Sequence, residues 1–105
     1  MVTAKNLTHG HSVGHKTTAE FRAWCSMKSR CYVETNEKYP IYGGRGITVH
    51  DAWLTDFQAF YDHVGPKPEP RYSLDRIDVN GNYEPGNVRW ATPSQQRLNQ
   101  RRMLA

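Results

Sequence analysis

The chain has 105 residues, of which 37% are hydrophobic and 23% charged, and its formal net charge is +4. This is the length of one domain, and no apolar run is long enough for a membrane span or a signal peptide. We therefore expect a small, soluble, cytoplasmic single-domain protein, with a metal or a partner adding to the modest stability of so short a chain.

The positive charge is concentrated near the C-terminus. Residues 1–84 contain ten basic and ten acidic side chains, whereas residues 85–105 contain four arginines and no acid. Such an excess is typical of a surface that contacts a polyanion, and a basic tail that only aids solubility is the alternative.

The first half of the chain contains two helix signals. Residues 1–16 are polar and without periodicity, which indicates a flexible arm. A capping box at Thr17–Glu20 predicts a helix that continues to about Val33. Within this helix Cys25 and Cys31 would face different sides, so a disulfide between them is not expected, and no C-x-x-C is present.

A turn-rich connector follows at residues 39–46 and leads into a short strand candidate at residues 47–50. A second capping box, at Thr55–Gln58, predicts another helix. Gly65-Pro66 should end that helix, because glycine accepts the left-handed cap and proline cannot continue the helix.

The last third of the chain predicts a strand, a loop, a strand and a helix. Residues 72–78 alternate in polarity like a strand, and residues 79–87 are rich in Asn, Gly and Pro. Residues 88–91 form the second strand. The capping box Thr92–Gln95, with proline at the first helical position, begins the helix over residues 93–102.

Several pieces of this last third share a recognisable spacing, namely Leu74–Asp78, Asn80-Gly81, Asn87–Thr92, Gln96 and Asn99. The pattern resembles the ββα-metal core of HNH (His-Me finger) nucleases of phages and mobile introns. Earlier in the chain, Gly43–Ile47 resembles the N-terminal part of small phage proteins that are grouped with these nucleases.

The resemblance implies a fold and a function. It implies an α+β domain in which two helices of residues 17–71 pack on a ββα-metal module of residues 72–105. It also implies a metal-dependent DNA endonuclease that hydrolyses or nicks phosphodiester bonds. If the protein is encoded by a phage, it would work in the cytosol of the host cell.

The resemblance also assigns residues to the site. Asp75 and Gln96 would hold Mg²⁺ or another divalent cation, with Asn99 or Gln100 as alternatives to Gln96. Asn87 would belong to the catalytic residues, bracing the loop between the strands and helping to orient the base. A purely structural interpretation of Asp75 is that it caps the hairpin and pairs with a neighbouring arginine.

Arg76 stands where the family has its general-base histidine. Arginine stays protonated and cannot accept a proton from water, although it can bind phosphate or stabilise a transition state. A base would then come from Tyr83, His50, His63 or a hydroxide on the metal. If none serves, the alternative function is a non-catalytic regulator or inhibitor of a phage that binds DNA or another protein.

Two further sets of residues are candidates for binding. Contacts with nucleic acid are expected from five arginines, Arg45, Arg89, Arg97, Arg101 and Arg102. A structural zinc held by Cys31, His50 and His9 is chemically sound, because mixed Cys/His ligation is common for this ion. Its spacing matches no standard zinc site, and the alternative is a buried thiol with a surface imidazole.

Overall fold

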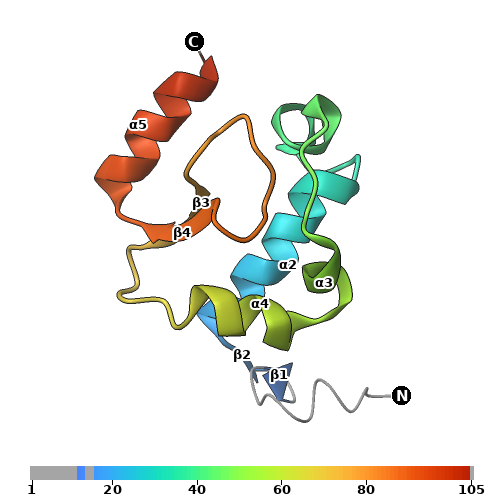
Figure 1. The fold of residues 1–105 in the computed structure, drawn as a ribbon, viewed down its shortest axis with the longest axis vertical. Coiled ribbons are helices and arrows are strands. Elements are labelled where there is room, and N and C mark those ends of the chain that lie inside the picture. Colours follow the sequence, from blue (N-terminus) through green and yellow to red (C-terminus); the bar gives the residue numbers. More distant parts are fainter. Residues whose placement is uncertain (1–11, 14–15, 105) are drawn as a thin grey trace.

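A computed structural model describes residues 12–13 and 16–104, and the side chains of residues 17–99. The fold is α+β, as predicted (Figure 1). Its elements are β1 (Ser12–Val13), β2 (Lys16–Thr17), α2 (Ala19–Tyr32), the 3₁₀ turns η1 (Tyr39–Ile41) and η2 (Gly43–Arg45), α3 (Asp51–Thr55), α4 (Phe57–Val64), β3 (Ser73–Arg76), β4 (Val88–Ala91) and α5 (Pro93–Leu104). None of the helices in these described ranges has the length and apolar character that a membrane crossing requires.

Helix α2 begins one residue later than its capping box predicted. Thr18 is the N-cap, and its hydroxyl accepts a hydrogen bond from the Phe21 amide at 3.1 Å. Glu20 accepts a hydrogen bond from the backbone amide of Lys67 at 2.9 Å, which ties the helix to the linker after α4. Two residues of the predicted arm, Ser12 and Val13, pair with β2, and residues 1–11 and 14–15 lie outside the described part.

The segment between α2 and α4 differs most from the prediction. Residues 47–50 form no strand there, and Val49 makes an isolated parallel bridge with Tyr83. The residues that follow form the short helix α3, for which the sequence has no capping signal. Helix α4 is present, but its N-cap is Asp56, one residue after the predicted Thr55, and Gly65 ends it with a positive φ of 71° as predicted.

Aromatic side chains from α2, α3 and α4 make the core. Trp24, Trp53, Phe57 and Phe60 are buried, and the Trp24 indole donates a hydrogen bond to the Trp53 carbonyl at 2.7 Å. Their rings meet in tilted and edge-on arrangements, which are the favourable geometries for aromatic pairs. These contacts give a small domain a core from few residues.

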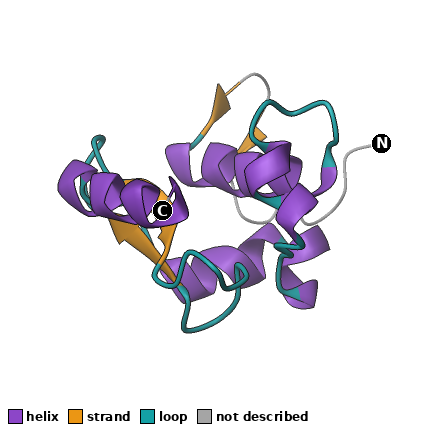
Figure 2. Cartoon of the chain, turned by 90° about the horizontal axis from the view of Figure 1, so that it is seen from above, coloured by secondary structure: helices purple, strands orange, loops and turns teal. Residues whose placement is uncertain are grey.

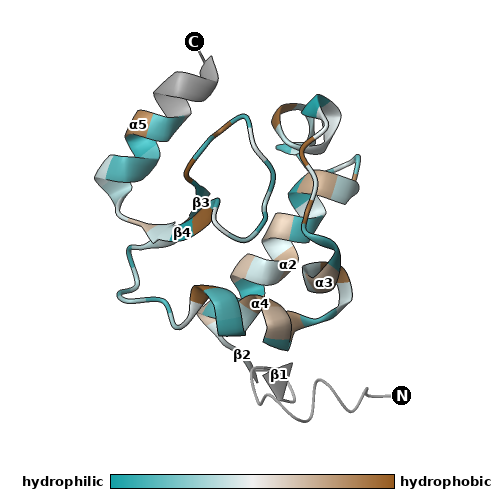
Figure 3. Ribbon diagram, viewed as in Figure 1, coloured by the Kyte–Doolittle hydropathy of each residue, from teal (hydrophilic) through white to brown (hydrophobic). Residues whose placement is uncertain are grey.

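The second half of the chain folds as the local signals predicted. Strands β3 and β4 pair antiparallel, with Asp75 opposite Arg89. At the start of α5 the Thr92 hydroxyl accepts from the Gln95 amide, and the Gln95 side chain accepts from the Thr92 amide, which confirms the capping box. Helix α5 lies along the hairpin in both views and is mostly hydrophilic where it is coloured (Figures 1–3).

The loop between β3 and β4 reaches into the first half of the molecule (Figure 1). The Asn82 side chain accepts a hydrogen bond from the Thr48 amide at 2.9 Å, and the Tyr83 ring is 1% exposed within the core. The Arg45 guanidinium donates to the Asn80 side chain at 2.7 Å. The loop therefore lies between the hairpin and helices α2 to α4. Its contacts fix the orientation of the C-terminal half (β3, β4 and α5) relative to the N-terminal half (α2 to α4).

Candidate active site

Asp75 lies on strand β3 of the hairpin, and two neighbouring side chains contact its carboxylate. The Asn99 amide group donates to one carboxylate oxygen of Asp75 at 2.6 Å, and Arg89 contacts the same oxygen at 3.4 Å. Asn99 also donates to the Arg76 carbonyl at 2.9 Å, so one buried amide fixes the helix, the strand and the carboxylate together. The pairing expected from a purely structural role of Asp75 is thus present with Arg89.

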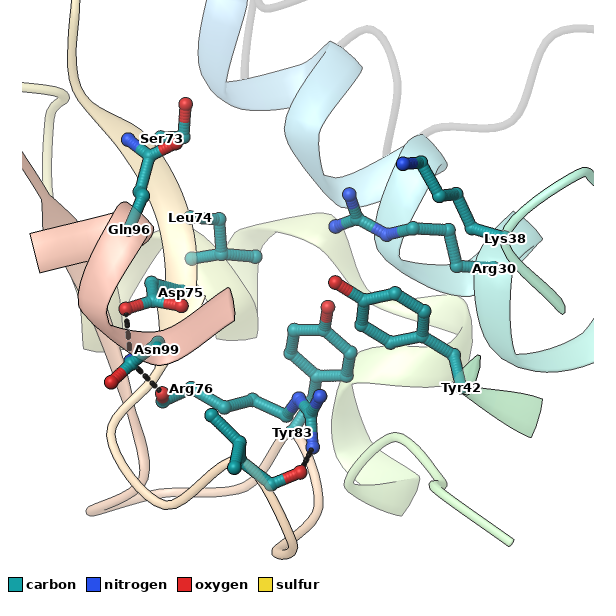
Figure 4. A pocket seen from close by; sticks show the side chains of 11 residues that line it. Arg30, Lys38, Tyr42, Ser73, Leu74, Asp75, Arg76, Tyr83, Gln96 and Asn99 are labelled. Atoms are coloured by element: carbon teal, nitrogen blue, oxygen red, sulfur yellow. Dashed lines mark hydrogen bonds between the residues drawn. The ribbon is translucent and has the colours of Figure 1, made fainter. Parts of the chain in front are cut away.

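A cavity of about 170 Å³ opens in front of this carboxylate. Asp75, Gln96 and Asn99 lie along one wall, which the hairpin and α5 provide (Figure 4). Arg30 and Tyr42 come from the opposite wall, formed by α2 and the connector after it. The cavity therefore lies between the two halves of the molecule.

Three polar groups of the opposite wall are available to a ligand. Arg30, Lys38 and Tyr42 point their polar ends toward the opening (Figure 4). The Arg30 Nε is buried and has no hydrogen-bond partner within residues 17–99, and the guanidinium lies 5.0 Å from the centre of the Tyr42 ring. A cation held by an aromatic ring keeps its N–H groups free for an anion.

Sequence reasoning missed these three residues. Arg30 and Lys38 lie far from the C-terminal motif along the chain, and no local pattern connects them with Asp75. The one usable signal is helical periodicity in α2. With Met27 and Cys31 turned to the core, the neighbouring Arg30 falls at the edge of the buried face.

Gln96 and Asn99 both line the cavity, and both already use their amide nitrogens. The Gln96 side chain donates to the Ala91 carbonyl at 3.0 Å, and Asn99 donates to Asp75 and to the Arg76 backbone. What each side chain retains for a ligand is its carbonyl oxygen, which is an acceptor only. The Asn99 oxygen points away from the cavity (Figure 4), which leaves the Gln96 oxygen as the neutral metal ligand available beside the Asp75 carboxylate.

Arg76 has a structural environment. Its side chain is 3% exposed, and its guanidinium donates to the backbone carbonyls of Val79 and of Gly81, the latter at 2.8 Å. The same group lies 5.0 Å from the Tyr42 ring centre and 5.4 Å from that of Tyr83. Arg76 thus closes the inner end of the cavity and holds the loop that follows β3.

Asn87 braces the loop. Its side chain accepts a hydrogen bond from the Asp78 amide at 2.7 Å and donates to the Asn82 carbonyl at 2.8 Å. A Cβ atom on Gly81 would lie 2.8 Å from the Asn87 amide nitrogen, so this turn needs glycine there. The bracing implied by the resemblance is therefore present in the contacts of Asn87.

The predicted general bases lie in different places. His50 and His63 pack against the Trp53 ring, with ring centres 5.3 and 5.4 Å from it, and line another part of the surface. Tyr83 does line the cavity, but burial raises the pKa of its hydroxyl far above the usual range. A phenol with such a pKa accepts no proton near neutrality.

The predicted arginines are scattered. Arg45 contacts the loop, Arg89 pairs with Asp75, and Arg97 is exposed on α5 beside Ser94. The side chains of Gln100, Arg101 and Arg102 lie outside the described residues. Of the predicted arginines whose side chains are described, only Arg89 lies next to Asp75.

The three proposed zinc ligands do not meet within the described part. Cys31 is buried in the core, His50 is exposed beside Trp53, and His9 lies outside the described residues. Among the side chains of residues 17–99, no group of three from His, Cys, Asp and Glu is arranged to hold a metal ion.

The two cysteines should differ in reactivity. Both are free thiols, Cys25 exposed and Cys31 buried, and burial raises the pKa of Cys31 to about 11. Since the thiolate is the reactive form, Cys31 stays protonated and protected at pH 8. We expect a chromogenic thiol reagent to titrate one thiol quickly in the native protein and a second only after denaturation. In Cys25→Ser the fast thiol should be missing, whereas two fast thiols in the parent protein would contradict the burial of Cys31.

Comparison of the chain with protein-family models, with curated proteins and with solved structures gives no match.

Proposed function

We propose that this protein is a metal-dependent nuclease of the HNH type, which hydrolyses or nicks phosphodiester bonds of DNA. One observation carries the proposal. A single cavity sets the Asp75 carboxylate, which Asn99 and Arg89 hold in place, opposite the cationic side chains of Arg30 and Lys38. Cleavage of a phosphodiester requires both walls. The cations neutralise the negative charge of the phosphate, and the carboxylate holds a metal ion close to it.

The donor set fits Mg²⁺. Asp75 would supply a carboxylate oxygen and Gln96 an amide oxygen, and Asn99 would act mainly by positioning Asp75. Mg²⁺ prefers oxygen ligands, keeps several waters and often uses only one or two carboxylates of the protein. When bound, such a cation would draw in the scissile phosphate and stabilise the leaving oxygen.

Side chains of the protein would bind the phosphate and maintain the shape of the cavity. The guanidinium of Arg30 and the ammonium of Lys38 would bind non-bridging phosphate oxygens, and the Tyr42 hydroxyl would donate a further hydrogen bond. Asn87 and Arg76 would keep the loop in the shape that completes the cavity. In this proposal Arg76 has a positioning role, which differs from the role of the base that it replaces.

A second candidate function is binding of DNA without cleavage. Within the described part of the chain, the residues that line the cavity include no histidine and no carboxylate besides Asp75. Arg76 cannot act as a base, and burial raises the pKa of Tyr83 away from neutrality. A cavity that binds phosphate but lacks a base would serve a binding protein.

Incubation with supercoiled plasmid separates the two functions. The nuclease should convert the plasmid to nicked or linear forms in Mg²⁺ or Mn²⁺, and EDTA should stop the reaction. Arg30→Gln should slow the reaction, while the exposed Arg71→Gln should leave it unchanged. A folded protein that retards plasmid in a gel but never nicks it, at any metal concentration, would reject the nuclease and support the binding function.

A further inference from the structure

A second cavity adjoins the first along α2. Both are lined by Arg30, Ser73 and Leu74, which form their common border, and the two cavities together are called the groove between α2 and β3. The α2 side of the second cavity also presents Ala19, Ala23 and Ser26. These small side chains leave room for a ligand close to the helix.

The cations of this groove follow the helix. Arg22, Ser26 and Arg30 are spaced four residues apart, which places them on one face of α2. Eight residues of α-helix span ~12 Å, and each strand of duplex DNA carries one charge per ~3.4 Å of axis. Arg22 and Arg30 are thus far enough apart to contact different phosphates of the same strand.

The electrostatics of the groove favour a polyanion. Arg22, Arg30 and Lys67 line the second cavity, and Lys38 extends the cationic side into the first. Among the described residues that line either cavity, Asp75 is the single acid. Cations spread along the length of a groove suit an extended polyanion better than a single ion, although Asp75 lies at one end and the Glu20 carboxylate accepts from the Lys67 backbone amide beside the other.

We propose that the groove between α2 and β3 binds the phosphodiester backbone of DNA, with Arg22, Lys67 and Arg30 contacting phosphates that lead to the one held opposite Asp75. This deepens the proposed function, on which it rests for the identity of the site at Asp75. It moves the main DNA contact from α5, where the cluster of arginines predicted it, to α2. Arg22 keeps free N–H groups for this role, because its contacts to Thr17 use only one terminal nitrogen.

The test is a binding titration in EDTA, where cleavage cannot interfere. A labelled 20-base-pair DNA duplex is titrated with the full-length protein by fluorescence anisotropy at several salt concentrations. Arg22→Gln and Lys67→Gln should each lower the slope of log K against log salt by ~0.9, the value for one lost phosphate contact. Ser26→Glu, which adds a negative charge at an exposed position in the groove, should weaken binding without altering the core.

Two control variants test whether the DNA binds near α5 instead of in the groove. Arg71→Gln removes the same charge beside Arg97, in a separate cavity near α5, and should bind like the parent protein. The combined Arg97, Arg101 and Arg102 to Gln variant tests α5 itself. Circular dichroism melts confirm that each variant is folded before its affinity is compared.

The outcomes are distinct. Unchanged slopes in Arg22→Gln and Lys67→Gln, loss of binding only in the α5 variant, or no binding by the parent protein at 50 mM salt would each overturn the groove. Binding that depends on Arg22 and Lys67 without any nicking in Mg²⁺ would keep the groove and reject the nuclease. Nicking by a protein whose DNA affinity does not depend on Arg22 and Lys67 would support the nuclease function and reject the groove as the DNA-binding surface.

Discussion

Asp75→Asn should nick supercoiled plasmid at least ~100-fold more slowly than the parent protein in Mg²⁺, because loss of a side chain that only positions a metal ligand costs ~10–100-fold, and Asp75 would be a ligand itself. The asparagine keeps the shape of the side chain and can still accept the hydrogen bond from Asn99. It removes the negative charge that a divalent cation needs. The rate is measured from the loss of supercoiled plasmid at saturating metal and matched salt.

A matched substitution controls for the charge change. Asp62 is exposed on α4, where it accepts a hydrogen bond from Gln58, and it lines neither cavity of the groove. Asp62→Asn should therefore cleave like the parent protein. Undiminished cleavage by a folded Asp75→Asn protein would place the chemistry elsewhere in the molecule.

Arg76→Ala should destabilise the protein by about 3 kcal/mol. The substitution leaves the Gly81 carbonyl without its donor and the Val79 carbonyl with only the long contact from Arg45 at 3.5 Å, and a buried acceptor without a partner costs about 1–3 kcal/mol. It also removes a cation that lies over the rings of Tyr42 and Tyr83. Urea denaturation followed by tryptophan fluorescence gives the change in the free energy of unfolding.

Arg45→Ala is the matched control, because Arg45 also donates to the loop, at the exposed Asn80 side chain and, at 3.5 Å, to the Val79 carbonyl. It should cost no more than ~1 kcal/mol. Equal losses for Arg45→Ala and Arg76→Ala would show that the burial of Arg76 has no special value. Arg76→His should also be less stable than the parent protein, because an imidazole cannot reproduce the two contacts of the guanidinium.

The parts of the fold that the sequence predicted well depend on neighbouring residues. The capping box at Thr92–Gln95 forms with both of its hydrogen bonds, and Gly65 ends α4 with a positive φ. The alternating strand at residues 72–78 is present over Ser73–Arg76. In each case the sequence signal and the structure that it predicts lie within the same few residues.

The remaining features depend on contacts between distant segments. Residues 47–50 have the composition of a strand, but their backbone partner is the loop at Tyr83, which supplies one bridge instead of a ladder. Arg76 looks like a substituted catalytic residue in the sequence, and only the fold shows the carbonyls around it. Arg30 lies opposite Asp75 across the cavity because the two parts of the chain pack together, which no local pattern encodes.

The position of Tyr83 bears on how the protein folds and on how it can be divided. This residue belongs to the hairpin loop, yet its ring completes a core built from residues 24–60, and its backbone bridges Val49. Contacts of such long sequence separation must form before the core is closed, which slows folding relative to a chain of local contacts. They also join the two halves into one cooperative unit. Residues 72–105 are consequently not an independent folding unit. If they were excised or grafted onto another protein, Tyr83 would lack the pocket that anchors their loop.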